Sequence, residues 1–391
     1  MRICFHKVEL LPDQGLLKNI EVAGRTCYKS EEKITETSAK AFVEMLLGRK
    51  HLSVLEHGSI YLTTPSSSPL SLKESPWCHI EDRKDGKRYY YTNFRYICEA
   101  YPELAIAIMK DEHLPEGVEF FIPEKNDPYK RYSFRLITNF KISEQYVRHR
   151  VFSHSKESTR YCNYTKDRFD HETTIVVPFG REMWFGGVTG KLEGIDEKWY
   201  FTPDEESPSL ENNWHKDKKN RYIIDAMNED PHLHKVLSRS KLAELDYFAA
   251  IQEGNRPEVA RDYLTLFTKT EQVMTGFAKD WSDLIKKRFV PGAQNEARFL
   301  ADKIKRALVS EIKPKKSSSK DSDIYTLDDL REIHRQMWHP EPVAADEPHI
   351  IVDRMIDRDV AGIAQDLGDH IAEAERPRVV LNRDIINEVL G

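Results

Sequence analysis

The sequence RHRVFSHSKESTRY, residues 148–161, is the most informative stretch of this chain. It holds three arginines, two histidines and four Ser or Thr hydroxyl groups in fourteen residues. Residues 132–140, just before it, alternate apolar and polar side chains and predict a half-buried strand. Guanidinium groups bind phosphate through paired hydrogen bonds, and hydroxyl groups can complete the shell of donors. The stretch predicts an anion pocket at the end of a strand, with a solvated basic turn as the alternative.

The composition restricts the class of protein. The 391 residues carry a net charge of −6, with 59 Lys and Arg against 65 Asp and Glu, which disfavours a non-specific nucleic-acid binder. No apolar run approaches the ~20 residues of a membrane span, and the N-terminus lacks the layout of a signal peptide. The five cysteines are widely spaced and form no zinc pattern. We therefore expect a cytoplasmic protein without membrane, metal or nucleic-acid partners.

The pattern Arg148-His149-Arg150, seven residues, Ser158, then Arg160, resembles the signature of the flavin-dependent thymidylate synthases. The run that continues to residue 164 is similar to a long-insert branch of that family. The family methylates dUMP to dTMP, with methylenetetrahydrofolate as carbon donor, FAD as hydride carrier and NADPH as the source of electrons. The resemblance implies an α+β fold, in which helices pack on a small antiparallel sheet, and a homotetramer with shared active sites.

Two earlier segments resemble further landmarks of the family. Residues 51–57 (HLSVLEH) are similar to a landmark that leads into a strand, here residues 60–64. The resemblance implies that His51 and Ser53 lie against FAD. We interpret Glu56 and His57 as residues that stabilise the turn. Cys27, in residues 23–28, stands where the family has a small polar residue that touches the flavin.

Two later segments resemble the third landmark, one around Arg261 and one that begins at Arg288, and their spacing agrees with compact members. The resemblance implies substrate contacts at Gln145, Arg148, Ser158, Thr159, Arg160, Arg261 and Arg288. It implies cofactor contacts at Cys27, His51, Ser53, Arg148, His149, Arg150, Lys156, Phe277, Lys279 and Asp283. The candidate catalytic residues are Arg288, which would stabilise charge on the pyrimidine, and Ser158, which would hydrogen-bond the substrate.

The chain departs from the compact pattern at several positions. It has Thr265 in place of Pro, Lys156 in place of Glu, Phe277 and Lys279 in place of Asn and Arg, and Asp283 in place of Asn. These changes and the insertions keep two alternatives open. One is a related one-carbon modification, such as hydroxymethylation, of a pyrimidine nucleotide, and the other is a flavin-free nucleotide-binding homologue.

Two familiar kinds of site are disfavoured. Cys162 stands beside the signature, but the family attaches no enzyme nucleophile, so we interpret it as a small buried residue. The chain has no GxGxxG motif and so no sign of a Rossmann site for FAD or NADPH.

The organisation of the chain follows from the same landmarks. We expect a catalytic domain over 1–312, with insertions at about 65–127 and 179–235, a linker over 313–323 and an accessory helical segment over 324–391. Hydrophobic spacing and breakers predict helices at 37–46, 102–110, 220–228 and 241–253, a strand-like aromatic run at 89–96, a strand at 173–178, and helical structure over 236–310.

Overall fold

The computed structural model describes residues 1–312, except 69, 71, 196–197 and 226–228. These residues form an α+β fold with three β-sheets, as expected, and every strand pair is antiparallel except β1 with β9. The predicted linker 313–323 and accessory segment 324–391 lie outside the described residues. No described helix has the length and apolar character that a membrane crossing requires.

The central sheet, here called sheet B, carries the signature. Its strands, in spatial order, are β2 (Lys7–Leu11), β7 (Arg131–Asn139), β13 (Lys269–Phe277) and β8 (Ser153–Lys156). The strand predicted over 132–140 is confirmed as β7, and β8 holds the middle of the signature stretch.

The expectation of helical structure through 236–310 is wrong for β13, the inner strand that pairs with both β7 and β8. Its buried positions include Thr270, Gln272 and Thr275, so no alternation of apolar and polar residues marks it in the sequence. Two of these side chains have polar partners inside the protein: Gln272 Oε1 accepts a hydrogen bond from Ser143 Oγ at 2.9 Å, and Thr275 Oγ1 lies 2.7 Å from His57 Nδ1. A strand covered on both faces loses the period of two that identifies a half-buried strand.

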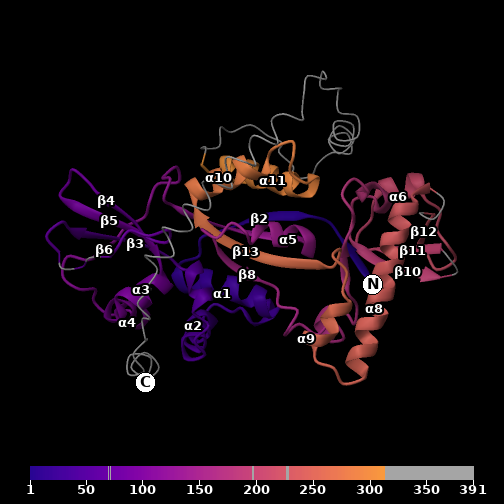
Figure 1. The fold of residues 1–391 in the computed structure, drawn as a ribbon, viewed down its shortest axis with the longest axis horizontal. Coiled ribbons are helices and arrows are strands. Elements are labelled where there is room, and N and C mark those ends of the chain that lie inside the picture. Colours follow the sequence, from indigo (N-terminus) through magenta and orange to yellow (C-terminus); the bar gives the residue numbers. More distant parts are fainter. Residues whose placement is uncertain (69, 71, 196–197, 226–228, 313–391) are drawn as a thin grey trace, which may run out of the picture. The chain divides into compact units, whose positions relative to one another are not determined.

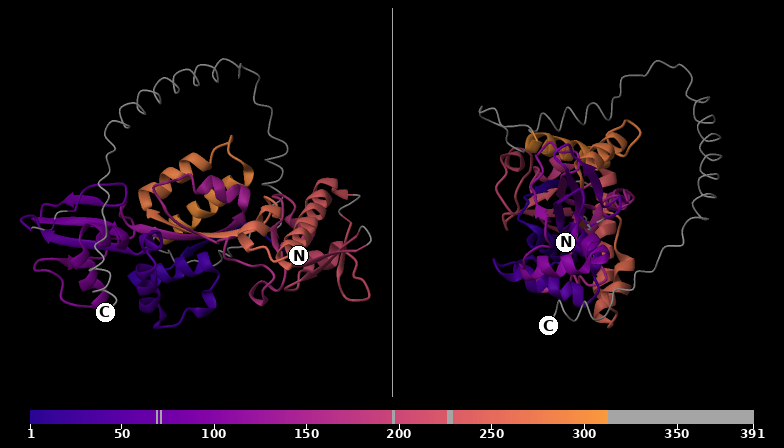
Figure 2. Two further views of the ribbon diagram at one scale, coloured as in Figure 1. Left: turned by 60° about the horizontal axis from the view of Figure 1, so that its bottom comes forward. Right: turned by 90° about the vertical axis from the view of Figure 1, so that its left-hand side faces the viewer.

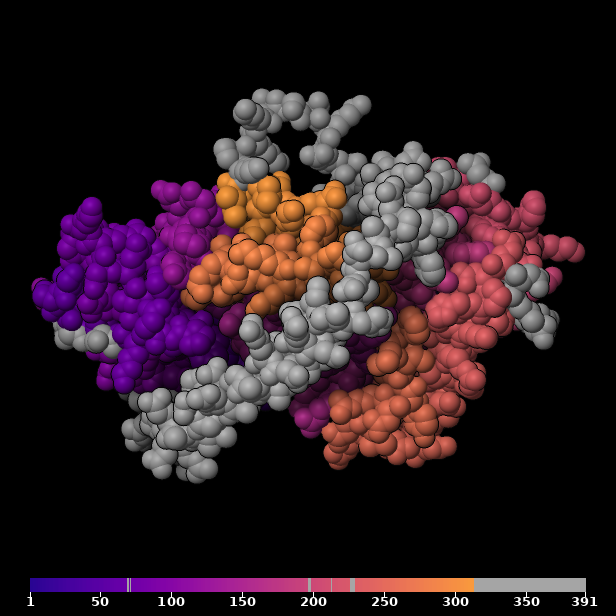
Figure 3. Space-filling model, turned by 45° about the horizontal axis from the view of Figure 1, so that its top comes forward, coloured from indigo at the N-terminus to yellow at the C-terminus, as the bar shows by residue number. Residues whose placement is uncertain are grey.

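Helices cover both faces of sheet B. Figures 1 and 2 show α1 (Leu16–Tyr28) and α2 (Ser38–Gly48) on one face, and α10 (Ala278–Arg288) and α11 (Asn295–Ile312) on the other. The short helix α5 (Phe140–Tyr146) joins α10 and α11 in one hydrophobic core. The space-filling view shows α10 and α11, in orange, at the surface (Figure 3).

One glycine lets the signature stretch approach the centre of this sheet. A Cβ atom on Gly276 of β13 would lie 2.4 Å from Cδ1 of Phe152, which packs on Trp281 with ring centroids 4.4 Å apart. Any side chain at position 276 would push the start of the signature away from the sheet. Glycine is therefore required here by close packing.

The first insertion forms a second sheet, sheet C. Its strands are β4 (His79–Asp82), β5 (Lys87–Asn93), β3 (Ser59–Pro65) and β6 (Glu119–Phe120), and its helices are α3 (Phe94–Ala100) and α4 (Pro102–Lys110). The helices predicted at 37–46 and 102–110 and the strand at 60–64 are confirmed. The aromatic run is a strand only to Asn93, because that side chain accepts a hydrogen bond from the Tyr96 amide at 3.0 Å and caps α3. Sheet C shares one hydrophobic core with α1 and α2.

The second insertion contributes to a third sheet, sheet A. Its strands are β12 (Tyr222–Ile224), β11 (Lys198–Pro203), β10 (Gly190–Ile195), β1 (Arg2–Cys4) and β9 (Thr174–Val176). The strand predicted at 173–178 is confirmed as β9. The helix predicted at 220–228 is wrong over residues 222–224, where Tyr-Ile-Ile forms β12. Aromatic and β-branched side chains favour a strand that packs into a core, and Tyr222 and Ile224 are both buried.

The remaining helices lie on or beside sheet A. They are α6 (Pro208–Asn213), the long helix α8 (Pro231–Gln252) and the short helix α9 (Pro257–Ala260). The helix predicted at 241–253 is confirmed as the second half of α8. The 3₁₀ turns are η1 (Glu31–Lys33), η2 (Leu52–His57), η3 (Asp167–Phe169), η4 (Glu182–Phe185) and η5 (Arg261–Tyr263).

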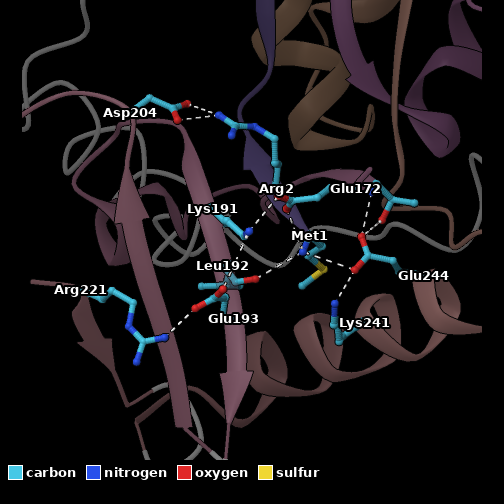
Figure 4. Close-up of polar contacts among 11 residues, drawn as sticks. Met1, Arg2, Glu172, Lys191, Leu192, Glu193, Asp204, Arg221, Lys241 and Glu244 are labelled. Atoms are coloured by element: carbon cyan, nitrogen blue, oxygen red, sulfur yellow. Dashed lines mark hydrogen bonds and ion pairs between the residues drawn. The ribbon is translucent and has the colours of Figure 1, made fainter. Parts of the chain in front are cut away.

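A buried acid attaches α8 to sheet A (Figure 4). Both the amide and the hydroxyl group of Thr173 donate to Glu244 Oε2 at 2.8 Å. The amino group of Met1 lies 3.3 Å from Glu244 Oε1 and 3.1 Å from Glu172. Glu244 is 2% exposed, so these partners replace the water that its charge would otherwise need.

Two buried histidines predict that stability depends on pH. His6 bonds Thr138, His57 bonds Thr275, and burial lowers their pKa values to about 4 and about 3. An unfolded histidine titrates near pH 6.5, so the unfolded chain binds more protons between pH ~6.5 and ~4. The free energy of unfolding will therefore fall as the pH falls through this range, by up to about 1.4 kcal/mol per pH unit for each histidine.

Urea denaturation at several pH values will measure this slope. The variant His57→Gln, which can keep the bond to Thr275, will show a slope shallower by one histidine's share. An unchanged slope in the variant would mean that His57 is not the group that titrates.

Candidate functional site

A buried ion network holds the signature stretch against β13. Glu157 follows β8, and its side chain is only 1% exposed. Lys269 Nζ lies 3.2 Å from Glu157 and also pairs with Glu271, which Lys29 reaches at 2.8 Å. We call Lys29, Glu157, Lys269 and Glu271 the buried ion network.

The opposite charges in this network keep Glu271 and Lys269 ionised. Burial alone would raise the pKa of Glu271, but the positive charges of Lys269 and Lys29 outweigh it and lower that pKa to about 2. Burial alone would lower the pKa of Lys269, but Glu157 and Glu271 outweigh it and raise that pKa. Tyr164 adds a hydrogen bond from its hydroxyl group to Glu157 at 3.2 Å. The network therefore fixes the point at which the chain enters residues 158–161.

Residues from three parts of the chain meet just beyond Glu157. The Ser158 amide donates to the Cys27 carbonyl at 3.0 Å, at the end of α1. Arg261 of η5 donates from one guanidinium nitrogen to Thr159 Oγ1 at 3.3 Å. The guanidinium of Arg160 lies 3.5 Å from Glu258 of α9. The Arg261 group is the set Ser158, Thr159, Arg160, Glu258 and Arg261.

A second cluster surrounds Arg288 at the end of α10. Its Nε donates to His149 Nε2 at 2.9 Å, and a terminal nitrogen donates to the Gln145 carbonyl at 2.6 Å. The Gln145 side chain in turn donates to Gln294 Oε1 at 2.6 Å. The Arg288 group is the set Gln145, His149, Arg288 and Gln294.

His149 is neutral in this arrangement. Burial and then the positive charge of Arg288 lower its pKa to about 4. A neutral imidazole can accept the Arg288 hydrogen bond at Nε2 only if its proton is on Nδ1. The Arg288 guanidinium is thus oriented by an imidazole and a carbonyl, neither of which neutralises its charge.

The predicted substrate residues therefore fall into two groups. Ser158, Thr159, Arg160 and Arg261 come together in the first, and Gln145 and Arg288 in the second. In the described part of the chain, no hydrogen bond or ion pair joins the two groups directly. Arg148, the remaining substrate candidate, is exposed.

Several predicted cofactor residues offer groups that fit FAD. Arg148 and Arg150 are exposed, and neither has a carboxylate partner within residues 1–312 as described. Such free guanidinium groups suit a pyrophosphate. His51 is half-buried and Ser53 is exposed, both on the landmark that includes η2. The donor set therefore fits a flavin nucleotide, which these residues would hold.

Other predicted cofactor residues have partners within the protein. Lys156 bonds Glu144 at 2.6 Å, Lys279 lies 3.2 Å from Asp280, and Asp283 lies 3.3 Å from Lys286. Phe277 is only 4% exposed and packs on Tyr129, with ring centroids 5.9 Å apart. Its ring leaves little surface for a ligand, and the flavin contact at this position stays a prediction.

The two cysteines near the signature are not activated nucleophiles. Cys162 is fully buried, and burial raises its pKa to about 12, which confirms the interpretation of a small buried residue. Burial also raises the pKa of Cys27 to about 11. At neutral pH both are thiols, and the thiolate is the reactive form.

Sequence reasoning missed the residues that support the site. Glu157, next to Lys156 in the signature stretch, has no role in the sequence prediction, and Lys269 lies in the strand expected to be helical. Tyr28, which bonds His51 at 2.6 Å, also has no predicted role. One signal in the sequence pointed to Glu157. A glutamate next to a hydroxyl-rich loop needs a positive partner if that loop is to bind an anion.

The part of the chain that carries both groups matches a known protein family. Residues 130–315 match the family model described as "Thymidylate synthase complementing protein". The matched segment contains the signature and both arginine landmarks, so the resemblance to this family is borne out over residues 130–315. This match supports methylation of a nucleotide, at the level of the family, as the class of activity.

One similar solved structure is a UMP/dUMP methylase, PolB, from Streptomyces cacaoi, bound with 5-Br dUMP. It is 14% identical, with a TM-score of 0.35, over 79% of this chain and 93% of the other chain, a similarity too low to support an argument. No curated protein matches the chain.

The buried ion network predicts a large cost for removing its central cation. In Lys269→Met, Glu157 is left charged and buried, so the free energy of unfolding will fall by about 3 kcal/mol. The double variant Lys269→Met/Glu157→Gln removes both charges and will recover part of that loss. Urea denaturation measures both, and a double variant no more stable than Lys269→Met would argue against the ion pair as the cause.

Proposed function

We propose that this chain catalyses the FAD-dependent reductive methylation of dUMP to dTMP, with methylenetetrahydrofolate as carbon donor and NADPH as reductant. The observation that supports this most is the contact of Arg261 with Thr159, which brings the third landmark onto the signature across 102 positions of sequence. Both segments match the family expectation for phosphate binding, and the family match includes both.

The Arg261 group is suited to the phosphate of dUMP. That phosphate carries about two negative charges at neutral pH. Arg160 and Arg261 supply two guanidinium groups, and Ser158 and Thr159 supply two hydroxyl groups. Glu258, which lies 3.5 Å from Arg160, would give up that weak contact when the anion binds. A contact at that distance in an exposed pair costs little to break.

The Arg288 group is suited to the pyrimidine ring. Its hydrogen bonds hold the guanidinium in place without cancelling its charge. A fixed cation would stabilise negative charge that develops on uracil during methylation. Bound FAD would supply the redox chemistry, held by Arg148, Arg150, His51 and Ser53. The protein itself would bind and orient the substrate and stabilise its negative charge.

The separation of the two groups fits sites shared between subunits. If one protomer supplies the Arg261 group and its partner supplies the Arg288 group, a homotetramer with shared active sites follows. A cytoplasmic location, where NADPH and folate cofactors are present, belongs to the same proposal.

Anaerobic turnover of dUMP with methylenetetrahydrofolate and NADPH, with and without FAD, tests this function. We expect a yellow protein, a flavin absorbance that bleaches with NADPH and dUMP, and dTMP formed only when FAD is present. The mass of the product will separate a methyl from a hydroxymethyl gain. A colourless protein that ignores added FAD would contradict the proposal.

The variant Arg261→Ala tests the phosphate role. Loss of charged hydrogen bonds will raise the dUMP dissociation constant roughly tenfold or more, as measured by calorimetry. Arg256→Ala is the matched control, because Arg256 lies on the same segment, is 84% exposed and is not expected at the phosphate. Equal losses in both variants would point to a general charge effect instead of a specific contact.

One alternative has an observation in its favour. The buried ring of Phe277 and the pairing of Lys156 with Glu144 leave fewer groups for a flavin than compact members have, which favours a flavin-free nucleotide-binding homologue. Titration with FAD and with dUMP separates the two functions. Binding of dUMP without binding of FAD would identify the alternative.

A further inference from the structure

Tyr28 is the point where three of the motifs meet. Its hydroxyl group lies 2.6 Å from Nδ1 of His51, and the two rings are stacked at 20° with centroids 6.3 Å apart. Its other ring neighbour is Tyr161 of the signature, with centroids 6.1 Å apart. The residue before it, Cys27, accepts the Ser158 amide hydrogen bond.

The backbone of Tyr28 is also held. It is the last residue of α1, and Arg168 donates to its carbonyl oxygen at 3.3 Å and to that of Lys29 at 3.2 Å. Lys29 caps the helix in the left-handed conformation, with φ of 48°. Backbone contacts therefore hold the main chain of Tyr28 in place, and two neighbouring rings hold its side chain.

The hydrogen bond couples the tautomer of His51 to the Tyr28 hydroxyl group. Burial raises the pKa of the Tyr28 hydroxyl above its ordinary value, so the hydroxyl keeps its proton at neutral pH and can donate it. When Nδ1 accepts, a neutral imidazole carries its proton on Nε2. His51 then presents Nε2 as a hydrogen-bond donor in a fixed orientation.

We propose that Tyr28 is a positioning residue for flavin binding: it holds His51 as an Nε2 donor and links that donor to the signature through the ring of Tyr161. This inference rests on the proposed function, because it takes His51 as a residue that contacts FAD. Tyr28 itself need not touch the cofactor. Its effect passes through the hydrogen bond to His51 and through the packing of the two tyrosine rings.

The variant Tyr28→Phe isolates the hydrogen bond, because it keeps the ring and both ring neighbours. The dissociation constant for FAD, measured by titration of the purified full chain, will rise about fivefold, the change expected for one neutral hydrogen bond. The absorbance spectrum of the bound flavin will also shift, because the donor near it loses its fixed orientation. Tyr200→Phe is the control, since Tyr200 lies on β11 in sheet A, and it will bind FAD as the wild type does.

A double-mutant cycle with His51→Gln tests whether Tyr28 acts through His51. Non-additive effects are expected, so that the double variant binds FAD no more weakly than His51→Gln alone. Additive losses would mean that Tyr28 acts independently and would overturn the inference. Thermal melting of each variant will show that all are folded at the titration temperature.

The failure of this inference differs from the failure of the proposed function. If the wild type binds FAD and Tyr28→Phe binds it with the same dissociation constant, only the positioning role is overturned. A wild-type chain that binds no FAD overturns the proposed function and this inference together.

Discussion

The buried pair of Lys269 and Glu157 is the interaction on which the arrangement of the site depends. Lys269 is at the start of the inner strand β13, and Glu157 is the residue at which the signature leaves β8. Two charges with so little contact with water are tolerated only when each has a close partner. The pair therefore ties the hydroxyl and arginine residues at 158–161 to the most enclosed strand of the sheet, and Phe152 against Gly276 ties the other end of the stretch.

From that anchored stretch, two arginines with different surroundings define two kinds of surface. Arg261 lies among hydroxyl groups and exposed charges, an environment that suits a hydrated anion. Arg288 is held by a neutral ring and a carbonyl group, which keeps its charge uncompensated. In the proposed function, the first arrangement would favour capture of a phosphate, and the second would favour stabilisation of charge that develops during the reaction. The hydrogen-bond partners of the two arginines would then adapt one residue type to two tasks.

The sequence was informative where local chemistry determines the outcome. The strand before the signature and the helices α2 and α4 follow from periodicity and from breakers such as Pro102. The convergence of Arg261 with the signature followed from a resemblance, since no local rule connects positions a hundred residues apart. The inner strand β13 was missed because both its faces are covered, and β12 was missed because a three-residue strand has too few positions to show a period. The network around Glu157 depends on partners from α1 and β13, which only the folded chain brings together.

The neutral state of His149 has a consequence for the chemistry of a catalytic cycle. With a pKa of about 4, this ring takes up almost no proton at any pH in which cells work. His149, the ring that holds Arg288, therefore cannot serve as a proton reservoir near neutral pH. If Arg288 meets the pyrimidine as proposed, His149 would not supply a proton to it. The ring would then act on the reaction only through the orientation that it gives to the guanidinium of Arg288.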